Sequence, residues 1–205
     1  NRGTAILVHD AIADRVKKLK HPTVNSTGIL LKNNRKTIKI INCYLPVAAP
    51  RNFNKHRDAL EKLTTHITNS APVIITGDLN GWIRSHNTHR TIWNTPAAKQ
   101  GEHLEEFALK MNLDILPIDP KENTRVSNMG NQSTLDYFMY KNIALGPQTT
   151  SATIIGSDHR AITTHILHCK KNSKKKGNDS LVCIRPRRVL QEDSKARHAY
   201  RDELT

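Results

Sequence analysis

The chain has 205 residues and carries 32 Lys and Arg against 18 Asp and Glu, a net charge of +14. This length allows one substantial hydrophobic core, and the charge predicts a polyanionic partner, nucleic acid before an anionic membrane surface. The three cysteines lack CxxC spacing and indicate neither a disulfide framework nor a zinc site, but a reducing compartment. No apolar run approaches the ~20 residues that a membrane span requires.

Three strands are predicted in the first part of the chain. Residues 5–8 are an apolar run typical of a buried strand. Because a domain seldom starts inside a strand, we expect the chain to be a fragment or a truncated copy. Residues 23–31 and 37–44 predict two further strands, and the polar turn at 32–35 predicts that they form a hairpin.

Two amphipathic helices are predicted further along. Residues 53–68 carry apolar side chains at helical spacing, with Asn52 or Asn54 suited to cap the helix. Residues 102–111 predict the second helix. Before it, 81–99 is a polar stretch that we expect to be a long loop lining a site. Its aromatic and basic residues are Trp82, Arg84, His86, His89, Arg90 and Trp93.

A buried strand with polar residues at its end lies between these regions. The apolar run 73–75 predicts a strand buried on both faces, which Gly77 ends before Asp78 and Asn80. Desolvating a carboxylate and a carboxamide is costly unless they have a use. In layered α/β proteins, sites are built at the carboxyl ends of strands. The alternative is a polar turn with Asx capping.

The remaining strands are expected at 113–116, 133–140, 149–155 and 161–167, most of them rich in Thr, Ile and Tyr. Strands paired by hairpins, with only occasional helices, predict two packed mixed β-sheets flanked by helices. The predicted domain ends at residue 168.

Residues 169–205 are predicted to be a basic extension. Five lysines stand in 169–179, and from 170 onward there are 11 Lys or Arg against 5 Asp or Glu. We expect this extension to become ordered only on a partner, with Lys174, Lys175 and Lys176 as candidate nucleic-acid contacts. The alternative is a solvated tail.

Four short segments carry the residue types that phosphodiester cleavage needs. They bring a phenol, three carboxylates, a carboxamide and an imidazole to the ends of predicted strands. Such groups can orient water, stabilise the charge on phosphorus and hold a divalent metal. The segments are Asn42-Cys43-Tyr44-Leu45-Pro46, Gly77-Asp78-Leu79-Asn80, Thr134-Leu135-Asp136-Tyr137-Phe138 and Gly156-Ser157-Asp158-His159-Arg160.

In this order the segments resemble the endonuclease/exonuclease/phosphatase superfamily, which includes the apurinic endonuclease of base-excision repair. The likeness covers roughly residues 2–168 and is closer to the endonuclease domain of non-LTR retrotransposons. There the Gly-Asp-x-Asn turn is typically followed by a His- and Trp-containing loop and a Gly-x-x-Leu-x-x-Phe helix, here 101–107. The resemblance implies an α/β fold, a four-layer α/β-sandwich, incomplete at the N-terminus. The end of the basic extension looks like the linker before reverse transcriptase, a weaker match.

The resemblance also implies roles for individual residues. His159 would contact the scissile phosphate and act as general acid or base, with Asp136 fixing its tautomer. Asp78 would orient or activate the attacking water, and Asn80 would fix that water and a phosphate oxygen. Tyr44 would donate to the phosphate.

Asp158 would support a Mg²⁺ site or His159, and the chain departs from the family near that metal. The family's Asn after the opening strand and its metal-binding Glu would precede residue 1, and residues 1–40 contain no Glu. Val47 stands where the family has a phosphate-binding Asn. The first strand and helix of the fold would also be missing, which would expose a sheet edge for a protein partner to cover.

Each candidate has a structural alternative. Tyr44 could be a packing residue, Asp136 a solvated strand residue and the Asp158–His159 pair a hairpin cap. Histidines three apart, at 86 and 89 and at 165 and 168, are expected to be surface or loop residues rather than zinc ligands.

Two functions follow from the sequence. The first is a Mg²⁺-dependent endonuclease that nicks DNA to leave a 3′-hydroxyl primer, with Trp82 and Arg84 among its nucleic-acid contacts. The second is a catalytically inactive, retrotransposon-derived domain that binds RNA or protein within a larger assembly. A lipid or nucleotide phosphatase fits the charge less well. The resemblance implies a nuclear location, an organelle stays open, and no membrane partner is expected.

Overall fold

A computed structural model describes residues 4–20, 25–33, 36–68, 70–88, 93–119, 121–153 and 156–167. The chain divides into two compact units, Asn1–His168 and Cys169–Thr205. All described residues belong to the first unit, so the predicted contacts Lys174, Lys175 and Lys176 lie outside them. No helix in the described ranges is long and apolar enough to span a membrane.

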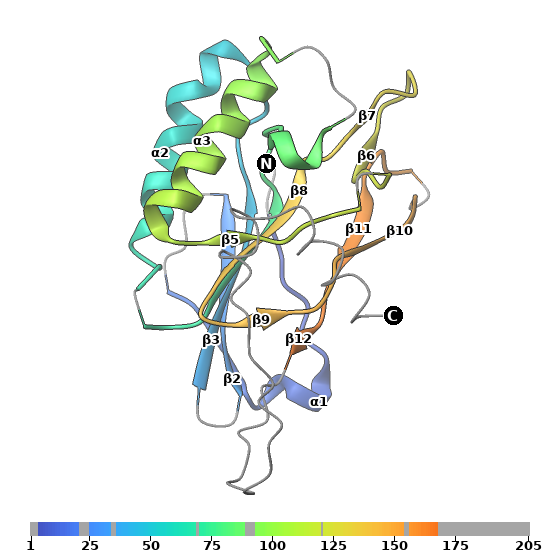
Figure 1. Cartoon of the computed structure of the whole chain (residues 1–205). Helices are drawn as coiled ribbons and strands as arrows, with labels where there is room; N and C mark the ends of the chain where they lie inside the picture. Colours follow the sequence, from blue (N-terminus) through green and yellow to red (C-terminus); the bar gives the residue numbers. More distant parts are fainter. Residues whose placement is uncertain are drawn as a thin grey trace, which may run out of the picture. The chain divides into compact units, whose positions relative to one another are not determined.

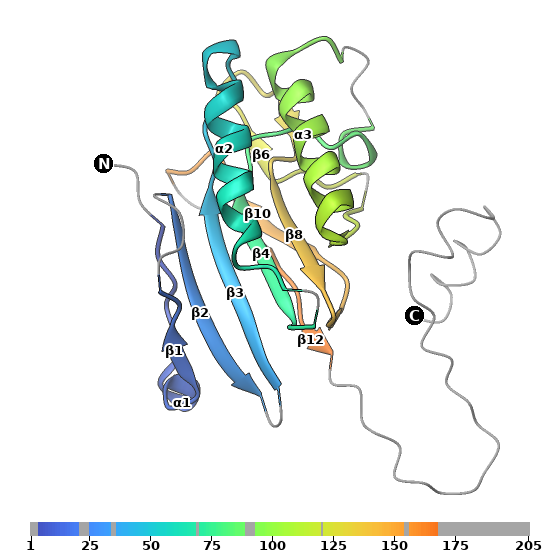
Figure 2. The same ribbon diagram turned by 90° about the vertical axis from the view of Figure 1, so that its left-hand side faces the viewer.

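The first unit is built on a six-stranded mixed sheet with the strand order β1-β2-β3-β4-β8-β5. Figure 2 shows β1 to β4 and β8 in this order. β3 and β4 run parallel, and the other neighbours are antiparallel. The predicted β2–β3 hairpin is confirmed. The strands are Val16–Lys18 (β1), Ser26–Asn33 (β2), Lys36–Tyr44 (β3), Val73–Asp78 (β4), Asp136–Lys141 (β8) and Asp114–Ile115 (β5).

Two helices, α2 (Phe53–Thr64) and α3 (Pro96–Met111), lie side by side against one face of this sheet (Figures 1 and 2). Strand and helix side chains form the larger core between them, because each helix turns one apolar face to the sheet. Its fully buried members include Ile41, Leu63, Ile75, Leu104 and Met139.

α3 begins six residues earlier than the predicted start at 102, because Thr95 caps it through the N–H of Ala98 and Pro96 occupies the first turn. α2 ends at Thr64 rather than at 68. Asn52 occupies its N-cap position, but the Asn52 side chain donates instead to the carbonyl of Val47.

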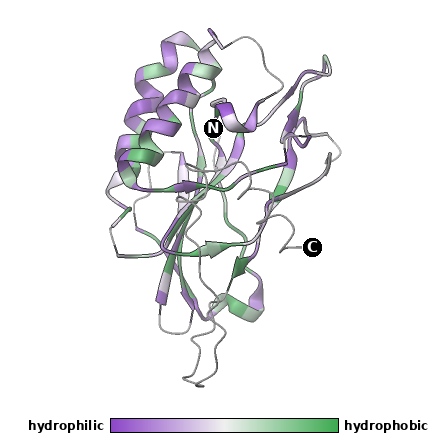
Figure 3. Cartoon of the chain, in the orientation of Figure 1, coloured by the Kyte–Doolittle hydropathy of each residue, from purple (hydrophilic) through white to green (hydrophobic). Residues whose placement is uncertain are grey.

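A second, smaller core covers the opposite face of the sheet. Strand residues alternate between the faces, so Ile38, Ile74 and Tyr140 point away from α2 and α3 and meet Leu116 and Leu145. Three two-stranded sheets complete the unit, and Figure 3 shows β9 and β12 as apolar. They pair β9 (Ala144–Leu145) with β12 (Ile166–Leu167), β10 (Thr149–Thr153) with β11 (Arg160–Thr163), and β6 (Arg125–Val126) with β7 (Gln132–Ser133).

The strand predicted at residues 5–8 is wrong. Residues 4–9 have no regular structure, and Leu7 is 97% exposed. Side-chain contacts hold this segment instead of a strand ladder: Thr27 donates to the carbonyl of Thr4, and Asn42 donates to that of Ala5. The first regular element is the four-residue helix α1 (Asp10–Ala13).

Later boundaries also differ from the prediction. The strand expected at 133–140 is interrupted at 134–135, between β7 and β8. The strand expected at 161–167 is likewise two short strands, β11 and β12. Short 3-10 turns stand at Pro50–Asn52 and Arg84–His86.

Candidate functional site

Three predicted site residues lie in one row across the central sheet. Tyr44 ends β3 opposite Asp78, and Asp78 ends β4 opposite Asp136 at the start of β8. Because side chains alternate along a strand, Asp78 and Asp136 share the face of Ile74 and Tyr140, away from the two helices. The row follows from the topology: parallel β3 and β4 end at the same edge, where antiparallel β8 begins.

Gly77 permits this alignment. The sequence predicted that Gly77 ends the strand, but in the structure β4 continues through Gly77, whose φ is +123°. A Cβ at this position would lie 2.1 Å from the carbonyl oxygen of Cys43 and 2.7 Å from Oδ1 of Asn42. Only glycine therefore lets β4 approach β3 this closely while placing Asp78 beside Tyr44.

The turn after β4 is an Asx turn, the geometry that the sequence left as an alternative. The backbone N–H of Asn80 donates to Oδ1 of Asp78 at 3.1 Å, and Asn80 adopts the left-handed conformation with φ of +51°. Its side chain is 5% exposed and donates through Nδ2 to the carbonyl of Leu45 at 2.9 Å. Asn80 thus ties the end of β3 to the turn that carries Asp78.

His159 completes the group from a different part of the chain. Its Nδ1 lies 3.0 Å from Oδ2 of Asp136, and its Nε2 lies 3.9 Å from Oδ2 of Asp78. The first distance is a hydrogen bond, and the second leaves a gap that no direct hydrogen bond spans. The structure therefore brings Asp78, Asp136 and His159 together, as the sequence predicted.

The surroundings raise the pKa of both Asp78 and His159. Burial, followed by the charge of Asp136, raises the pKa of Asp78 to about 6. The hydrogen bond that Nδ1 of His159 donates to the Asp136 carboxylate raises the pKa of His159, against the opposing effect of burial. A raised carboxyl pKa makes Asp78 a stronger base than a surface aspartate, and a raised imidazole pKa keeps His159 charged to higher pH.

Thr124, which the sequence analysis missed, connects the strand that carries Asp136 to the segment that carries His159. Its buried Oγ1 accepts the backbone N–H groups of Leu135 and Asp136 at 3.0 and 3.1 Å. Its carbonyl accepts the N–H of Arg160 at 2.8 Å. One residue thereby fixes the start of β8 and the segment that carries His159. A threonine in a polar, aperiodic stretch gives no sequence signal of this role.

Tyr137 was also missed as a support of the turn. It is fully buried on the helix side of β8, and its hydroxyl lies 2.9 Å from the carbonyl of Gly81. The same hydroxyl accepts the N–H of Ile83 and the amide of Asn87. Burial of this network raises the pKa of Tyr137. The network anchors the loop that follows Asp78.

Asp158, predicted to support a metal, is paired with Arg125. Nε of Arg125 donates to Oδ2 of Asp158 at 2.7 Å, and the backbone N–H of Val126 donates to the Asp158 carbonyl. Burial alone would raise the pKa of Asp158, but the hydrogen bond and charge of Arg125 outweigh it and lower this pKa. The carboxylate is thus held ionised by an arginine.

Several side chains in 81–99, the stretch predicted to be a loop lining the site, make contacts that the sequence did not predict. Arg84 is exposed, and its guanidinium lies 4.7 Å from the ring centroid of Trp93, a cation–π contact. Trp82 is partly buried, and its backbone N–H donates to the carbonyl of Ala97. His86, expected in a loop, is buried and bonds the carbonyl of Leu116 through Nε2. Residues 89 and 90 lie outside the described ranges.

The four site segments lie within a stretch of the chain that matches a known protein family. A family model described as endonuclease-reverse transcriptase matches residues 38–163, more than half of the chain and all four site segments. No curated protein sequence matched.

Among solved structures, the endonuclease domain of TRAS1, a telomere-specific non-LTR retrotransposon, matches with a TM-score of 0.55 and 15% identity. The match covers 74% of this chain and 66% of that one, just under two thirds. An endonuclease/exonuclease/phosphatase from Beutenbergia cavernae matches with a TM-score of 0.52 and 12% identity, over 67% of this chain and 37% of that one. The predicted α/β-sandwich class is confirmed. The chain belongs to the endonuclease-reverse transcriptase family, within the endonuclease/exonuclease/phosphatase superfamily.

Proposed function

We propose that this domain hydrolyses phosphodiester bonds in DNA and leaves a nick with a 3′-hydroxyl. The observation that carries the proposal is the gap of 3.9 Å between Nε2 of His159 and Oδ2 of Asp78, with Asp136 holding the other ring nitrogen. An imidazole fixed on one side by a carboxylate presents its second nitrogen in a defined direction. A phosphate oxygen or a water fits between such groups.

In the proposed reaction Asp78 is the general base. Its carboxylate takes a proton from water, whose oxygen attacks phosphorus while the bond to the 3′-oxygen breaks, and the departing 3′-oxygen takes a proton from solvent to become the hydroxyl. Protonated His159 donates through Nε2 to a non-bridging phosphate oxygen and stabilises the charge that develops there. Asn80 holds the turn of Asp78, and Tyr44, next to it in the sheet, donates to the phosphate.

The family implies Mg²⁺, and the donor set suits such an ion. In the described part of the chain no three His, Cys, Asp or Glu side chains form a metal-binding group. Mg²⁺, however, is commonly bound by one or two carboxylates with waters and substrate phosphates. Asp136, a partly buried carboxylate beside Asp78 in the sheet, would hold it together with the substrate phosphate, which leaves Asp78 as the base. When bound, it would neutralise charge on the phosphate.

DNA is the proposed substrate because the chain carries a net charge of +14 and the family is that of retroelement endonucleases. The exposed Arg84, stacked on Trp93, offers a cation and an aromatic face beside the turn that follows Asp78. Trp82, Lys174, Lys175 and Lys176 are further proposed contacts. On the family resemblance we propose a nuclear location, with an organelle as the alternative.

Cleavage of a labelled DNA duplex tests the proposal. With Mg²⁺ we expect a nick whose 3′ end a DNA polymerase extends without further processing, and no nick in EDTA. Ends that cannot be extended would contradict the proposed cleavage of the bond to the 3′-oxygen.

Duplex binding without cleavage, by a chain shown to be folded, would support the second function instead. The domain would then act as a basic nucleic-acid-binding component of a larger assembly. The same comparison made with RNA distinguishes the two nucleic acids as ligands.

A further inference from the structure

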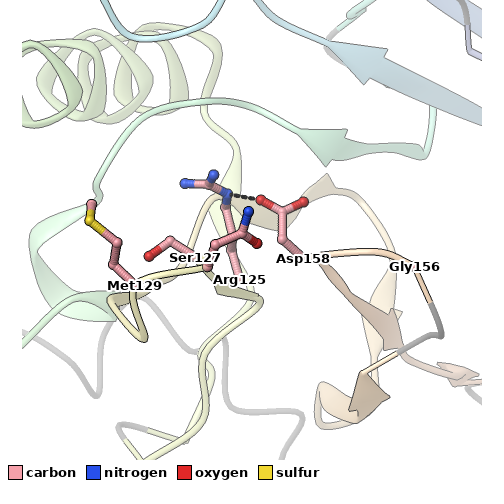
Figure 4. A pocket seen from close by; sticks show the side chains of 6 residues that line it. Arg125, Ser127, Met129, Gly156 and Asp158 are labelled. Carbon is pink, nitrogen blue, oxygen red and sulfur yellow. Dashed lines mark hydrogen bonds and ion pairs between the residues drawn. The ribbon is translucent and has the colours of Figure 1, made fainter.

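A polar pocket lies next to His159. Its volume is about 520 Å³, and its lining comes from the β6–β7 hairpin and the segment before β11 (Figure 4). The lining residues are Arg125, Ser127, Asn128, Met129, Gly156 and Asp158. The pocket is formed by neighbours of His159, because Asp158 precedes His159 in the chain and Arg125 forms a backbone bridge with His159.

Arg125 uses only part of its guanidinium in this pocket. Nε donates to Asp158, while Figure 4 shows the two terminal nitrogens turned away from that carboxylate. Among the described residues, no further hydrogen bond or ion pair of the Arg125 guanidinium is found. A guanidinium has five N–H donors, so most of the fork is available to a ligand. Such a fork matches the oxygens of a phosphate.

The surroundings of Arg125 suit an anion of the substrate. The side chains of Arg125 and Asp158 are 36% and 39% exposed, so a ligand can reach them. The charge of Arg125 also acts on Asp78, which places the guanidinium within electrostatic reach of the proposed base. The hairpin is ordered by the bond from the N–H of Ser127 to the carbonyl of Asn131, and the Ser127 hydroxyl lines the pocket.

We propose that Arg125 binds a backbone phosphate of the nucleic acid next to the scissile one, and that Asp158 positions Arg125 rather than ligating a metal. This inference rests on the proposed function for its substrate but not on hydrolysis, because it concerns binding. Asp158 restricts the guanidinium through Nε and leaves the terminal nitrogens on the side away from its carboxylate. The restriction reduces the entropy that the arginine would lose when it meets the phosphate.

The test is the salt dependence of binding to a fluorescent DNA duplex, measured by anisotropy in EDTA so that no cleavage occurs. Arg125→Ala is compared with Arg57→Ala, which removes an exposed arginine from α2 on the other side of the sheet. We expect Arg125→Ala to weaken binding roughly tenfold for any sequence and to reduce the slope of log K against log salt by about 0.9. Arg57→Ala should change neither.

Two further variants distinguish the effects of the guanidinium geometry and of its orientation on DNA binding from the effect of positive charge alone. Arg125→Lys should keep the slope but lose affinity, because a point charge replaces the fork. Asp158→Asn should weaken binding severalfold, although the loss of a negative charge would by itself strengthen it. Its Mg²⁺ affinity should stay unchanged.

An unchanged slope in folded Arg125→Ala, or tighter binding by Asp158→Asn, would overturn the inference even if the wild type nicks DNA. Conversely, the expected slopes from a wild type that never nicks DNA would support the inference and contradict the proposed hydrolysis. Folding of each variant is checked by thermal unfolding.

Discussion

In the described part of the site, the surroundings of Asp78 disfavour its ionised form. It lies opposite Asp136 in the sheet and is largely buried, yet the proposed reaction needs it ionised. His159 and, more weakly, Arg125 oppose the repulsion. A carboxylate whose ionised form is disfavoured has a higher affinity for a proton. The abstraction of a proton from water requires such an affinity.

The rate of nicking should therefore rise with pH through about 6. Asp78 is protonated below that pKa and cannot act as a base. At higher pH the rate should fall once His159 loses its proton, above the ordinary imidazole range because Asp136 raises its pKa. Single-turnover rates between pH 5 and 9 check both limbs. A rate that is flat around pH 6 would argue against Asp78 as the base.

Asp78→Asn should abolish nicking but stabilise the fold at pH 7 by about 2 kcal/mol. The folded-state pKa of Asp78 is raised, so ionisation costs stability above about pH 6, and this cost disappears as the pH falls toward the unfolded value. An uncharged amide removes the cost. Urea unfolding of both proteins at pH 7 and pH 4 is the measurement, and the gain should vanish at pH 4. A destabilised variant at pH 7 would contradict the account.

At the scale of elements, the site depends on how closely β3 and β4 approach. Gly77 has backbone and side-chain oxygens of its neighbours where a Cβ would stand, whereas nothing lies within 4 Å of a Cβ at Gly130. Both residues have positive φ, at +123° and +76°. Substituting alanine at each of the two glycines therefore distinguishes the loss of stability caused by a steric clash from the loss caused by positive φ alone.

Gly77→Ala should destabilise the domain by more than ~3 kcal/mol, and Gly130→Ala by only ~1 kcal/mol, the cost of a left-handed alanine. The midpoint of urea unfolding measures both changes. Gly77→Ala should also reduce nicking, because β4 must move away from β3. Equal effects of the two substitutions would show that the close approach of the strands is unimportant.

The sequence predicted the elements whose pattern is strong. The buried run before Asp78, the β2–β3 hairpin and the sheet-facing stripe of α2 all show the period of their structure. The start of α3 was missed because its first turns are polar or small, and only the Thr95 cap marks them. The run at 5–8 has strand composition but no strand to pair with among the described residues.

The candidate site residues Asp78, Asp136 and His159 could be predicted because each lies in a short motif of polar residues at the end of a predicted strand. Thr124 and Arg125 could not be found in this way, because their roles depend on contacts with segments more than ten residues away in the chain. Local spacing carries no information about such contacts.

At the scale of the whole molecule, the positive charge is unevenly distributed along the chain. Residues 170–205 hold 11 Lys or Arg against 5 Asp or Glu, and they follow the unit that carries the site. A cluster of lysines attracts the DNA backbone without regard to sequence. We therefore propose that this extension adds to the affinity for DNA without taking part in the chemistry, which belongs to the folded unit.

Replacing Lys174, Lys175 and Lys176 by alanine should weaken DNA binding and lower the salt slope by up to about 3, one phosphate for each lysine. The nicking rate of the bound complex, measured with protein in excess, should not change. Anisotropy gives the first quantity and single-turnover kinetics the second. A lower rate at saturation would place these lysines in the chemistry instead.

Nicking of supercoiled plasmid by the 205-residue chain tests the central claim most directly. The wild type is compared with His159→Ala and with His165→Ala, which removes an exposed histidine from the segment before β12. We expect nicking with Mg²⁺ by the wild type and by His165→Ala, none in EDTA, and a loss of at least a hundredfold in His159→Ala. Equal nicking by His159→Ala, or none by a folded wild type, would contradict the account.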